Sequence, residues 1–112
     1  DQTTSLWLNG ALHHKPACVF TSSGSMHGGQ ESTLLTMLPP LFHHGMMIMG
    51  LANANPALYN TKSGGTPYGA SHVSGPRHDL GLSQDEKVLC EEQGKCWRKV
   101  VQKLQAGASL IA

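Results

Sequence analysis

Two short apolar segments limit the fold of this chain more than any other feature. Lys15 to Phe20 ends in four apolar residues, and Met46 to Leu51 is apolar apart from one glycine, which is typical of strands buried on both faces. A helical pattern lies between them, so the two strands are expected to run parallel. A parallel pair leaves both edges open, and two strands are rarely stable alone. The sequence therefore predicts an α/β domain whose sheet continues outside these two segments.

The helix between the strands is expected to begin at Gln30. Its apolar residues fall at helical spacing; they are Leu34, Leu35, Leu38, Leu41 and Phe42. Pro39 and Pro40 each lack a backbone donor and crowd the preceding turn. We therefore expect a main helix from Gln30 to Leu38 and a kinked last turn through His44, with Gly45 as the residue that ends it.

The C-terminal half of the chain is expected to contain a long loop and one helix. Between Ala52 and Leu82 the sequence has no periodicity and is rich in glycine, proline and asparagine, so residues 52–82 are predicted to form a long loop insertion. Ser83 and Glu86 have the spacing of a capping box, in which each side chain satisfies the other residue's backbone amide. The box predicts a C-terminal helix over residues 83–105.

The charge balance argues against two classes of partner. Charged residues make up 13% of the chain and the formal net charge is +1, which gives no electrostatic reason to bind nucleic acid or a membrane surface. The apolar run from Met46 to Ala52 is shorter than the ~20 residues of a membrane span, and we find no secretion-signal pattern. The chain begins at Asp1 rather than at a methionine, so we expect it to be part of a longer protein.

The cysteines and histidines predict neither a disulfide framework nor a metal site. The three cysteines, Cys18, Cys90 and Cys96, are an odd number without paired spacing, which favours a reducing, cytoplasmic location. The seven histidines contain no HExxH motif and no Cys/His ladder, so no metal ligands are predicted.

Residues 21–29, rich in serine and glycine, form the segment best suited to chemistry and are expected to be irregular. The segment follows the first strand and precedes a helix, which is where ligands bind in open α/β sheets. Its glycines allow close approach to the backbone, and its amide and hydroxyl donors suit an anion or a polarised carbonyl. It has neither a Walker nor a GxGxxG pattern. The residues alone leave two interpretations open, a ligand-binding loop and an ordinary flexible turn.

Three motifs in order along the chain resemble one known family. They are FTSSGSMHGGQES (Phe20–Ser32), FHHGM (Phe42–Met46) and GGTPYGAS (Gly64–Ser71), and the initial LWLNGAL (Leu6–Leu12) also matches. Together they resemble the tryptophan-repressor-binding-protein family of flavodoxin-like quinone reductases. The resemblance implies that residues 1–112 are the C-terminal half of a flavodoxin-like domain, a parallel sheet with flanking helices present here only as its C-terminal β-α-β-α portion. The phosphate loop of the family would precede residue 1.

The resemblance also implies a set of site residues. FMN would lie along the loop made of Ser22, Ser23, Gly24, Ser25, Met26, His27 and Gly28. His43 would approach the flavin as a catalytic and cofactor-binding residue, and Trp7 would line the quinone pocket. Considered without the family, a histidine pair such as His43-His44 at a helix end is most often a partner of the helix dipole or a satisfied surface group, and less often a ligand.

The function implied is an FMN-dependent NAD(P)H:quinone oxidoreductase. Hydride would pass from NAD(P)H to the flavin, and two electrons would then pass to a quinone. The family also implies a homo-oligomer, with a tetramer as the first expectation. Two alternatives remain open. One is a flavodoxin-type carrier of single electrons between partner proteins, against which the long 52–82 segment argues, and the other is an inactive fragment without flavin.

Overall fold

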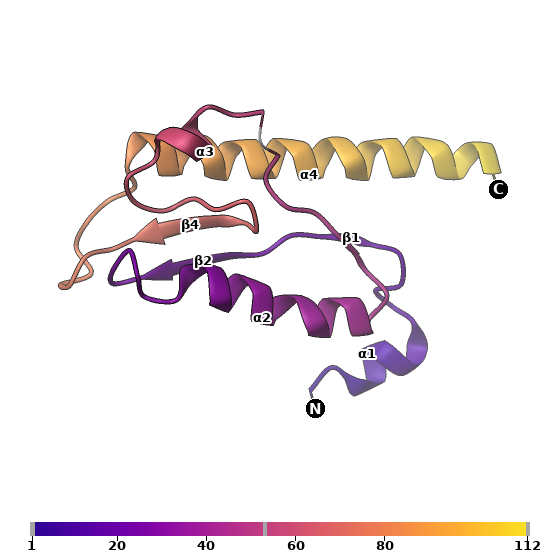
Figure 1. Cartoon of the computed structure of the whole chain (residues 1–112). Coiled ribbons are helices and arrows are strands. Elements are labelled where there is room, and N and C mark those ends of the chain that lie inside the picture. Colours follow the sequence, from indigo (N-terminus) through magenta and orange to yellow (C-terminus); the bar gives the residue numbers. More distant parts are fainter. Residues whose placement is uncertain (1, 53, 112) are drawn as a thin grey trace.

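The computed structural model describes residues 2–52 and 54–111. Asp1, Asn53 and Ala112, which fall within the ranges predicted above, lie outside the described residues. In chain order the elements are α1 (Thr4–Asn9), β1 (Pro16–Ala17), β2 (Phe20–Ser23), α2 (Gln30–His43), β3 (Met47–Ile48), α3 (Ala57–Asn60), β4 (Ala70–Val73) and α4 (Gln84–Ile111). Figure 1 shows the strands between α2 on one side and α4 on the other.

All strand pairs of the described residues are parallel. β1 pairs with β3 through Pro16–Met47 and Ala17–Ile48, and β2 pairs with β4 in register from Phe20–Ala70 to Ser23–Val73. α2 packs against β2 and β3, whereas α4 packs against β1 and β4. The predicted α/β class with parallel strands and flanking helices is confirmed, and the arrangement agrees with part of a flavodoxin-like fold.

The predicted strand boundaries need correction. The first strand, expected over Lys15–Phe20, is divided into β1 and β2, and β2 extends to Ser23. Thr21 to Ser23 were expected to be irregular because their side chains are not apolar. They form a strand because β4 supplies their backbone partners. β3 covers only Met47 and Ile48 of the predicted Met46–Leu51.

Residues 52–82 are not a structureless loop. They contain the short helix α3 and the strand β4. β4 was hidden in the sequence because Ser71 and His72 are polar. Ser71 is buried nevertheless, and its hydroxyl accepts a hydrogen bond from the Gly65 amide at 2.7 Å and donates one to Gln30 at 2.8 Å. A buried polar side chain with partners can occupy a strand, but the partners are distant in sequence.

α2 has the last turn that was predicted beyond Leu38. The helix continues through Pro39 and Pro40 to His43, one residue short of the predicted His44. The carbonyl groups that lose a helical partner there belong to Leu35 and Thr36, four residues earlier. These two residues and both prolines are exposed, so water can satisfy the freed carbonyls.

Gly45 ends α2 as expected. Its φ of 74° is in the left-handed region, its amide donates to the Phe42 carbonyl at 2.9 Å, and the Met46 amide donates to the Leu41 carbonyl at 3.1 Å. These two bonds form a Schellman motif, which satisfies the last carbonyls of the helix. Only glycine adopts this conformation without strain from a β-carbon.

The predicted capping box begins α4. The Ser83 hydroxyl accepts from the Glu86 amide at 3.1 Å, and Glu86 Oε1 accepts from the Ser83 amide at 2.7 Å. The helix begins at Gln84 and runs to Ile111, six residues beyond the predicted end at 105. No helix within the described residues combines the length and hydropathy that crossing a membrane requires.

Glu86 has a second role as a buried acceptor. Its side chain is 1% exposed, and Oε2 accepts from the amides of Gly64 and Val73, both at 2.8 Å. Burial by itself raises the pKa of Glu86, but hydrogen bonds from Ser83, Val73, His72 and Gly64 outweigh it and lower the pKa from 4.5 to about 2. The carboxylate therefore joins the turn before β4, the end of β4 and the start of α4.

We expect replacement of Glu86 by glutamine to destabilise the protein in a pH-dependent way. The lowered pKa corresponds to about 3 kcal/mol at neutral pH. Because the folded-state pKa is depressed, this stability is fully present above about 4.5 and is lost as the pH falls toward 2. Urea unfolding at several pH values measures it. Glu86→Gln should be less stable at pH 7 and lack this acid dependence.

Glu91→Gln is the matched control, because Glu91 lies exposed on the same helix. Its stability should stay within about 0.5 kcal/mol of the wild type. Equal losses in the two variants would contradict the role assigned to the buried carboxylate.

Candidate functional site

The serine- and glycine-rich loop from Gly24 to Gly29 joins the end of β2 to the start of α2. The Ser23 hydroxyl donates to the Ser25 carbonyl at 2.7 Å, and the Gly28 amide donates to the same carbonyl at 3.1 Å. A β-carbon on Gly28 would lie 3.0 Å from the Ser23 β-carbon and 3.1 Å from the Ser25 carbonyl. The loop is therefore a tight turn closed on itself, in which a side chain at Gly28 would crowd Ser23 and Ser25.

Gln30 fixes this loop to the sheet. Its side chain is buried; Nε2 donates to the Ser23 hydroxyl at 2.8 Å and to the His72 carbonyl at 2.9 Å. Oε1 accepts from the Ser71 hydroxyl at 2.8 Å. One side chain at the first position of α2 thus holds the end of β2 and the middle of β4. Gln30 was predicted only as the start of a helix, and its place directly after Gly28-Gly29 was the one feature of the sequence that could have indicated this anchoring role.

A second loop, residues 74–82, lies against the first. The Ser74 amide donates to the Ser23 carbonyl at 2.8 Å. A β-carbon on Gly24 would lie 3.3 Å from His78 Cε1, which places the imidazole of His78 beside the start of the serine- and glycine-rich loop. Sequence analysis did not connect His78 with this loop, because nothing in the pattern of residues 74–82 indicates which segment it packs on.

The outer surface of the first loop is open and polar. Ser22, Ser25, Met26, His27 and Gly28 are exposed, while Ser23 and Gly24 are half-buried. No described side chain caps the first amides of α2, whose N-cap is Gly29. Uncapped amides at a helix N-terminus favour an anion or a polarised carbonyl. A hollow of about 510 Å³ adjoins them, lined by residues that include Met26, His27, Ser32, Ser63 and Thr66.

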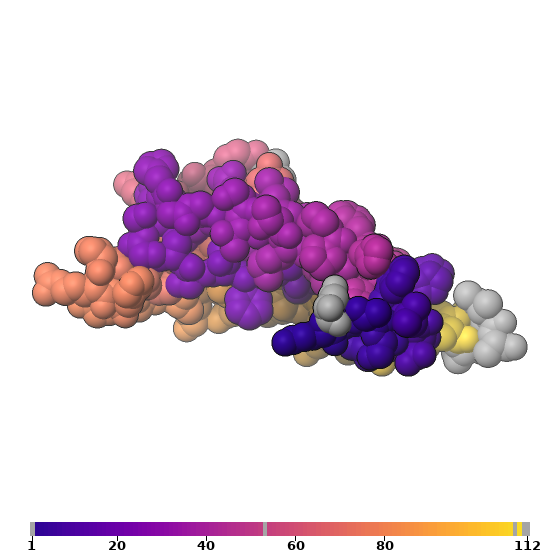
Figure 2. Space-filling view, turned by 90° about the horizontal axis from the view of Figure 1, so that it is seen from below, coloured from indigo at the N-terminus to yellow at the C-terminus, as the bar shows by residue number. Residues whose placement is uncertain are grey.

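His43 and Trp7 lie at the other end of α2. Their rings stack with centroids 4.6 Å apart, beside a hollow of about 390 Å³ that is also lined by His13 and His44. α2 runs from Gln30 to His43, so at 1.5 Å per residue about 20 Å separates its two ends. In the space-filling view of Figure 2, α1 and loop 74–82 occupy opposite ends of the molecule, with α2 between them. The structure brings His43 and Trp7 together but does not bring them to the loop.

The remaining histidines do not form a metal centre. His13 and His14 stack with ring centroids 3.9 Å apart, and His44 is buried, with no hydrogen-bond partner for Nδ1 among the described residues. Within residues 2–52 and 54–111, no three histidine, cysteine, aspartate or glutamate side chains are grouped so as to hold a metal ion.

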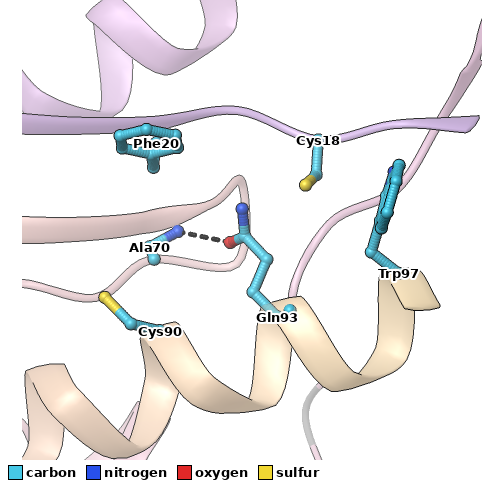
Figure 3. A pocket seen from close by; sticks show the side chains of 7 residues that line it. Cys18, Phe20, Ala70, Cys90, Gln93 and Trp97 are labelled. Carbon is cyan, nitrogen blue, oxygen red and sulfur yellow. Dashed lines mark hydrogen bonds between the residues drawn. The ribbon is translucent and has the colours of Figure 1, made fainter.

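An apolar groove of about 370 Å³ lies between the sheet and α4. Figure 3 shows six of its lining residues, Cys18, Phe20, Ala70, Cys90, Gln93 and Trp97. Both polar atoms of the Gln93 amide are engaged, since Nε2 donates to the Val19 carbonyl at 2.9 Å and Oε1 accepts from the Ala70 amide at 2.6 Å. Burial, followed by the charges of Glu86 and Glu91, raises the pKa of Cys90 and keeps it a thiol. The groove therefore offers apolar surface and not catalytic groups.

Comparison with known proteins finds relatives for nearly the whole chain. A protein of Rhizobium rhizogenes is 43% identical over 108 residues, which are 95% of this chain and 54% of the relative. A protein of Geotalea daltonii is 42% identical over 106 residues, with 93% and 52% covered. A protein of Sinorhizobium fredii is 41% identical over 106 residues, with 93% and 53% covered. Each is named NAD(P)H dehydrogenase (quinone).

The chain spans about half the length of the curated relatives it matches. No protein-family model matches it. Identity above 40% over more than nine-tenths of the chain confirms the resemblance to quinone reductases that the motifs indicated.

We expect Gln30→Leu to loosen the junction between the loop and the sheet. Leucine keeps the volume but removes the three hydrogen bonds that Gln30 makes with the Ser23 hydroxyl, the Ser71 hydroxyl and the His72 carbonyl, at a cost of about 1–3 kcal/mol. Chemical denaturation measures the loss, and hydrogen exchange should rise in residues 22–29. Gln102→Leu, at an exposed position of α4, is the control and should change little. A Gln30→Leu variant with wild-type stability and exchange would contradict the anchoring role.

Proposed function

Because the chain is homologous over nearly its whole length to proteins named NAD(P)H dehydrogenase (quinone), we propose that it is part of an FMN-dependent NAD(P)H:quinone oxidoreductase of the tryptophan-repressor-binding-protein type. The observation that carries the proposal is the tight loop after β2, held by Gln30 at the end of two parallel strands. This is the position at which open α/β sheets bind their ligands.

The residues at this edge fit a flavin ring. Residues 25–28 are exposed and Gly28 carries no side chain, so a planar ligand can approach the loop backbone closely. The exposed hydroxyls of Ser22 and Ser25 and the backbone amides of the loop are hydrogen-bond donors for the polar edge of such a ring. FMN, when bound, would supply the hydride-accepting and electron-donating chemistry. The loop amides and the uncapped N-terminus of α2 would stabilise negative charge developing beside them.

His43 and Trp7 would serve the site from a different copy of the protein. They lie about 20 Å from the loop along α2, which is too far to border the same ring within one chain. Several large apolar side chains near this end are exposed, among them Leu8 at 70% and Phe42 at 60%, and such surface favours association. We therefore assign the stacked Trp7–His43 pair to the quinone side of a site completed across a homo-oligomer, with a tetramer as the expected state.

The structure weakens the argument against the electron-carrier alternative. The long 52–82 segment argued against a carrier because it could wall in a small-molecule pocket or bind a neighbouring subunit, but part of this segment is β4, which belongs to the sheet. Direct oxidation of NAD(P)H with stoichiometric reduction of a quinone distinguishes the two functions. A carrier would need a separate reductase for this turnover, and an inactive fragment would be colourless once free FMN had been removed by gel filtration.

The loop is tested by Gly28→Val in the complete enzyme. Valine would collide with Ser23 and Ser25 and deform the turn, so flavin affinity should fall at least about tenfold, which corresponds to about 1.4 kcal/mol. Absorbance of the purified protein and titration with FMN measure the loss. Gly94→Ala is the control, because a β-carbon there meets open space. Unchanged flavin affinity in Gly28→Val would refute the assignment of residues 22–28.

Mixing of subunits tests the assignment of His43. We expect His43→Ala to retain flavin and lose quinone turnover, because its proposed role is on the quinone side. In oligomers reassembled from equal amounts of His43→Ala and Gly28→Val chains, random pairing should restore about a quarter of the sites if loop and histidine come from different copies. Mixed oligomers without restored turnover would show that the two act within one chain or not at all.

A further inference from the structure

His72, on β4, is placed between two hydrogen-bond acceptors. Its Nδ1 lies 3.0 Å from Glu86 Oε1, and its Nε2 lies 2.9 Å from the Leu80 carbonyl oxygen. A carbonyl oxygen cannot donate. The Glu86 carboxylate cannot donate either, because three backbone amides and His72 together outweigh burial and lower its pKa to about 2, which keeps it ionised.

Both ring nitrogens of His72 must therefore carry a proton for both hydrogen bonds to exist. A neutral imidazole has one N–H and one lone pair, whereas the imidazolium ion has two N–H groups. If the ring loses a proton, a lone pair faces either the Leu80 carbonyl or the Glu86 carboxylate, and that contact becomes repulsive. The side chain is 21% exposed, so solvent can exchange the proton.

The Leu80 contact closes loop 74–82. The Leu80 amide donates to the Ser74 carbonyl at 3.0 Å, and Ser74 in turn donates to the Ser23 carbonyl. Residues 76–82 are exposed, and Figure 1 shows the segment between β4 and α4 projecting beyond the ends of β2 and β4. Within the described residues, the contact with His72 Nε2 is the one hydrogen bond that joins the C-terminal part of this loop to the sheet. Its loss would free Leu80 and its neighbours, whereas Ser74 would stay bonded to Ser23.

We propose that His72 is a proton-operated latch: as the imidazolium it fastens the C-terminal part of loop 74–82 to Glu86 and the sheet, and on deprotonation it releases Leu80 while Ser74 stays bonded to Ser23. The latch thus makes the C-terminal part of the loop, beside the site at residues 22–28, more ordered in acid and more open in alkali. That this ordering regulates flavin binding rests on the proposed function; the latch itself does not.

Among the described residues, Glu86 is the charged side chain that pairs with His72. From α4, Cys90 lines the same hollow, and its raised pKa keeps it neutral. Loop 74–82 carries Arg77, His78 and Asp79, of which His78 is engaged with the Ser74 hydroxyl. The paired strand β2 has only Phe20, Thr21, Ser22 and Ser23, and none of these ionises in this range.

The latch is tested first on the wild-type protein. Long-range ¹H–¹⁵N spectra of the histidine rings, recorded from about pH 5 to pH 9 to span histidine titration, should show protons on both nitrogens of His72 at the acid end and on one at the alkaline end. Amide protection of Leu80, corrected for intrinsic exchange, should fall at least about tenfold over the same interval. A single ring proton at pH 5, or constant protection, would overturn the proposal.

Two variants separate the latch from general effects of pH. His72→Gln carries no titrating group, so the pH dependence of Leu80 protection should disappear. His78→Gln is the matched control: its Nδ1 faces a hydroxyl, which can donate or accept, so the pH dependence should persist. Equal behaviour of the two variants would overturn the proposal.

FMN titration of the complete enzyme across the same pH range tests the regulatory link. Flavin affinity that falls together with Leu80 protection supports the link. Affinity that stays constant while the loop opens refutes the link and leaves the latch standing, whereas absence of flavin binding at every pH counts against the proposed function alone.

Discussion

The fold of the described residues depends most on the hydrogen bonds that the buried carboxylate of Glu86 accepts. The buried apolar side chains of the described residues are few, and three of them are the alanines Ala17, Ala57 and Ala70, so apolar burial alone gives little cohesion. Glu86 compensates by accepting hydrogen bonds from the turn before β4, from the end of β4 and from the start of its own helix. Because an ionised group so buried is costly unless fully partnered, all of these segments must be in place together.

Gln30 and Gln93 extend the same principle across both faces of the sheet. Gln30 connects β2 with β4 from the side of α2, and Gln93 connects Val19 with Ala70 from the side of α4. A side-chain amide has a donor and an acceptor, so it can join two strands where their own ladder is incomplete. The candidate site is consequently positioned by buried polar contacts and not by a large apolar core, which makes its geometry sensitive to single polar substitutions.

The structural features that were predicted correctly from the sequence are those determined by contacts between neighbouring residues. The capping box at Ser83–Glu86 and the glycine end of α2 depend on neighbours within a few residues, and both are present. Prediction failed where the contacts are distant. β4 was missed because its polar residues are satisfied by Gln30 and Glu86, which are distant in the sequence. The position of the serine- and glycine-rich loop could be predicted from the sequence. The contacts of His72 and the separation of His43 from this loop could not.

That separation has a physical cause in α2 itself. The helix has 14 residues and acts as a rigid spacer. The hydrogen bonds of Gln30 fix its first turn, and the Schellman motif at Gly45 ends its last turn. No rotation of side chains can close about 20 Å. If the loop and the stacked Trp7–His43 pair act in one reaction, the chain must meet another copy of itself, and the exposed apolar side chains at the α1 end supply a reason to do so. Assembly would then be a condition of catalysis rather than a by-product of it.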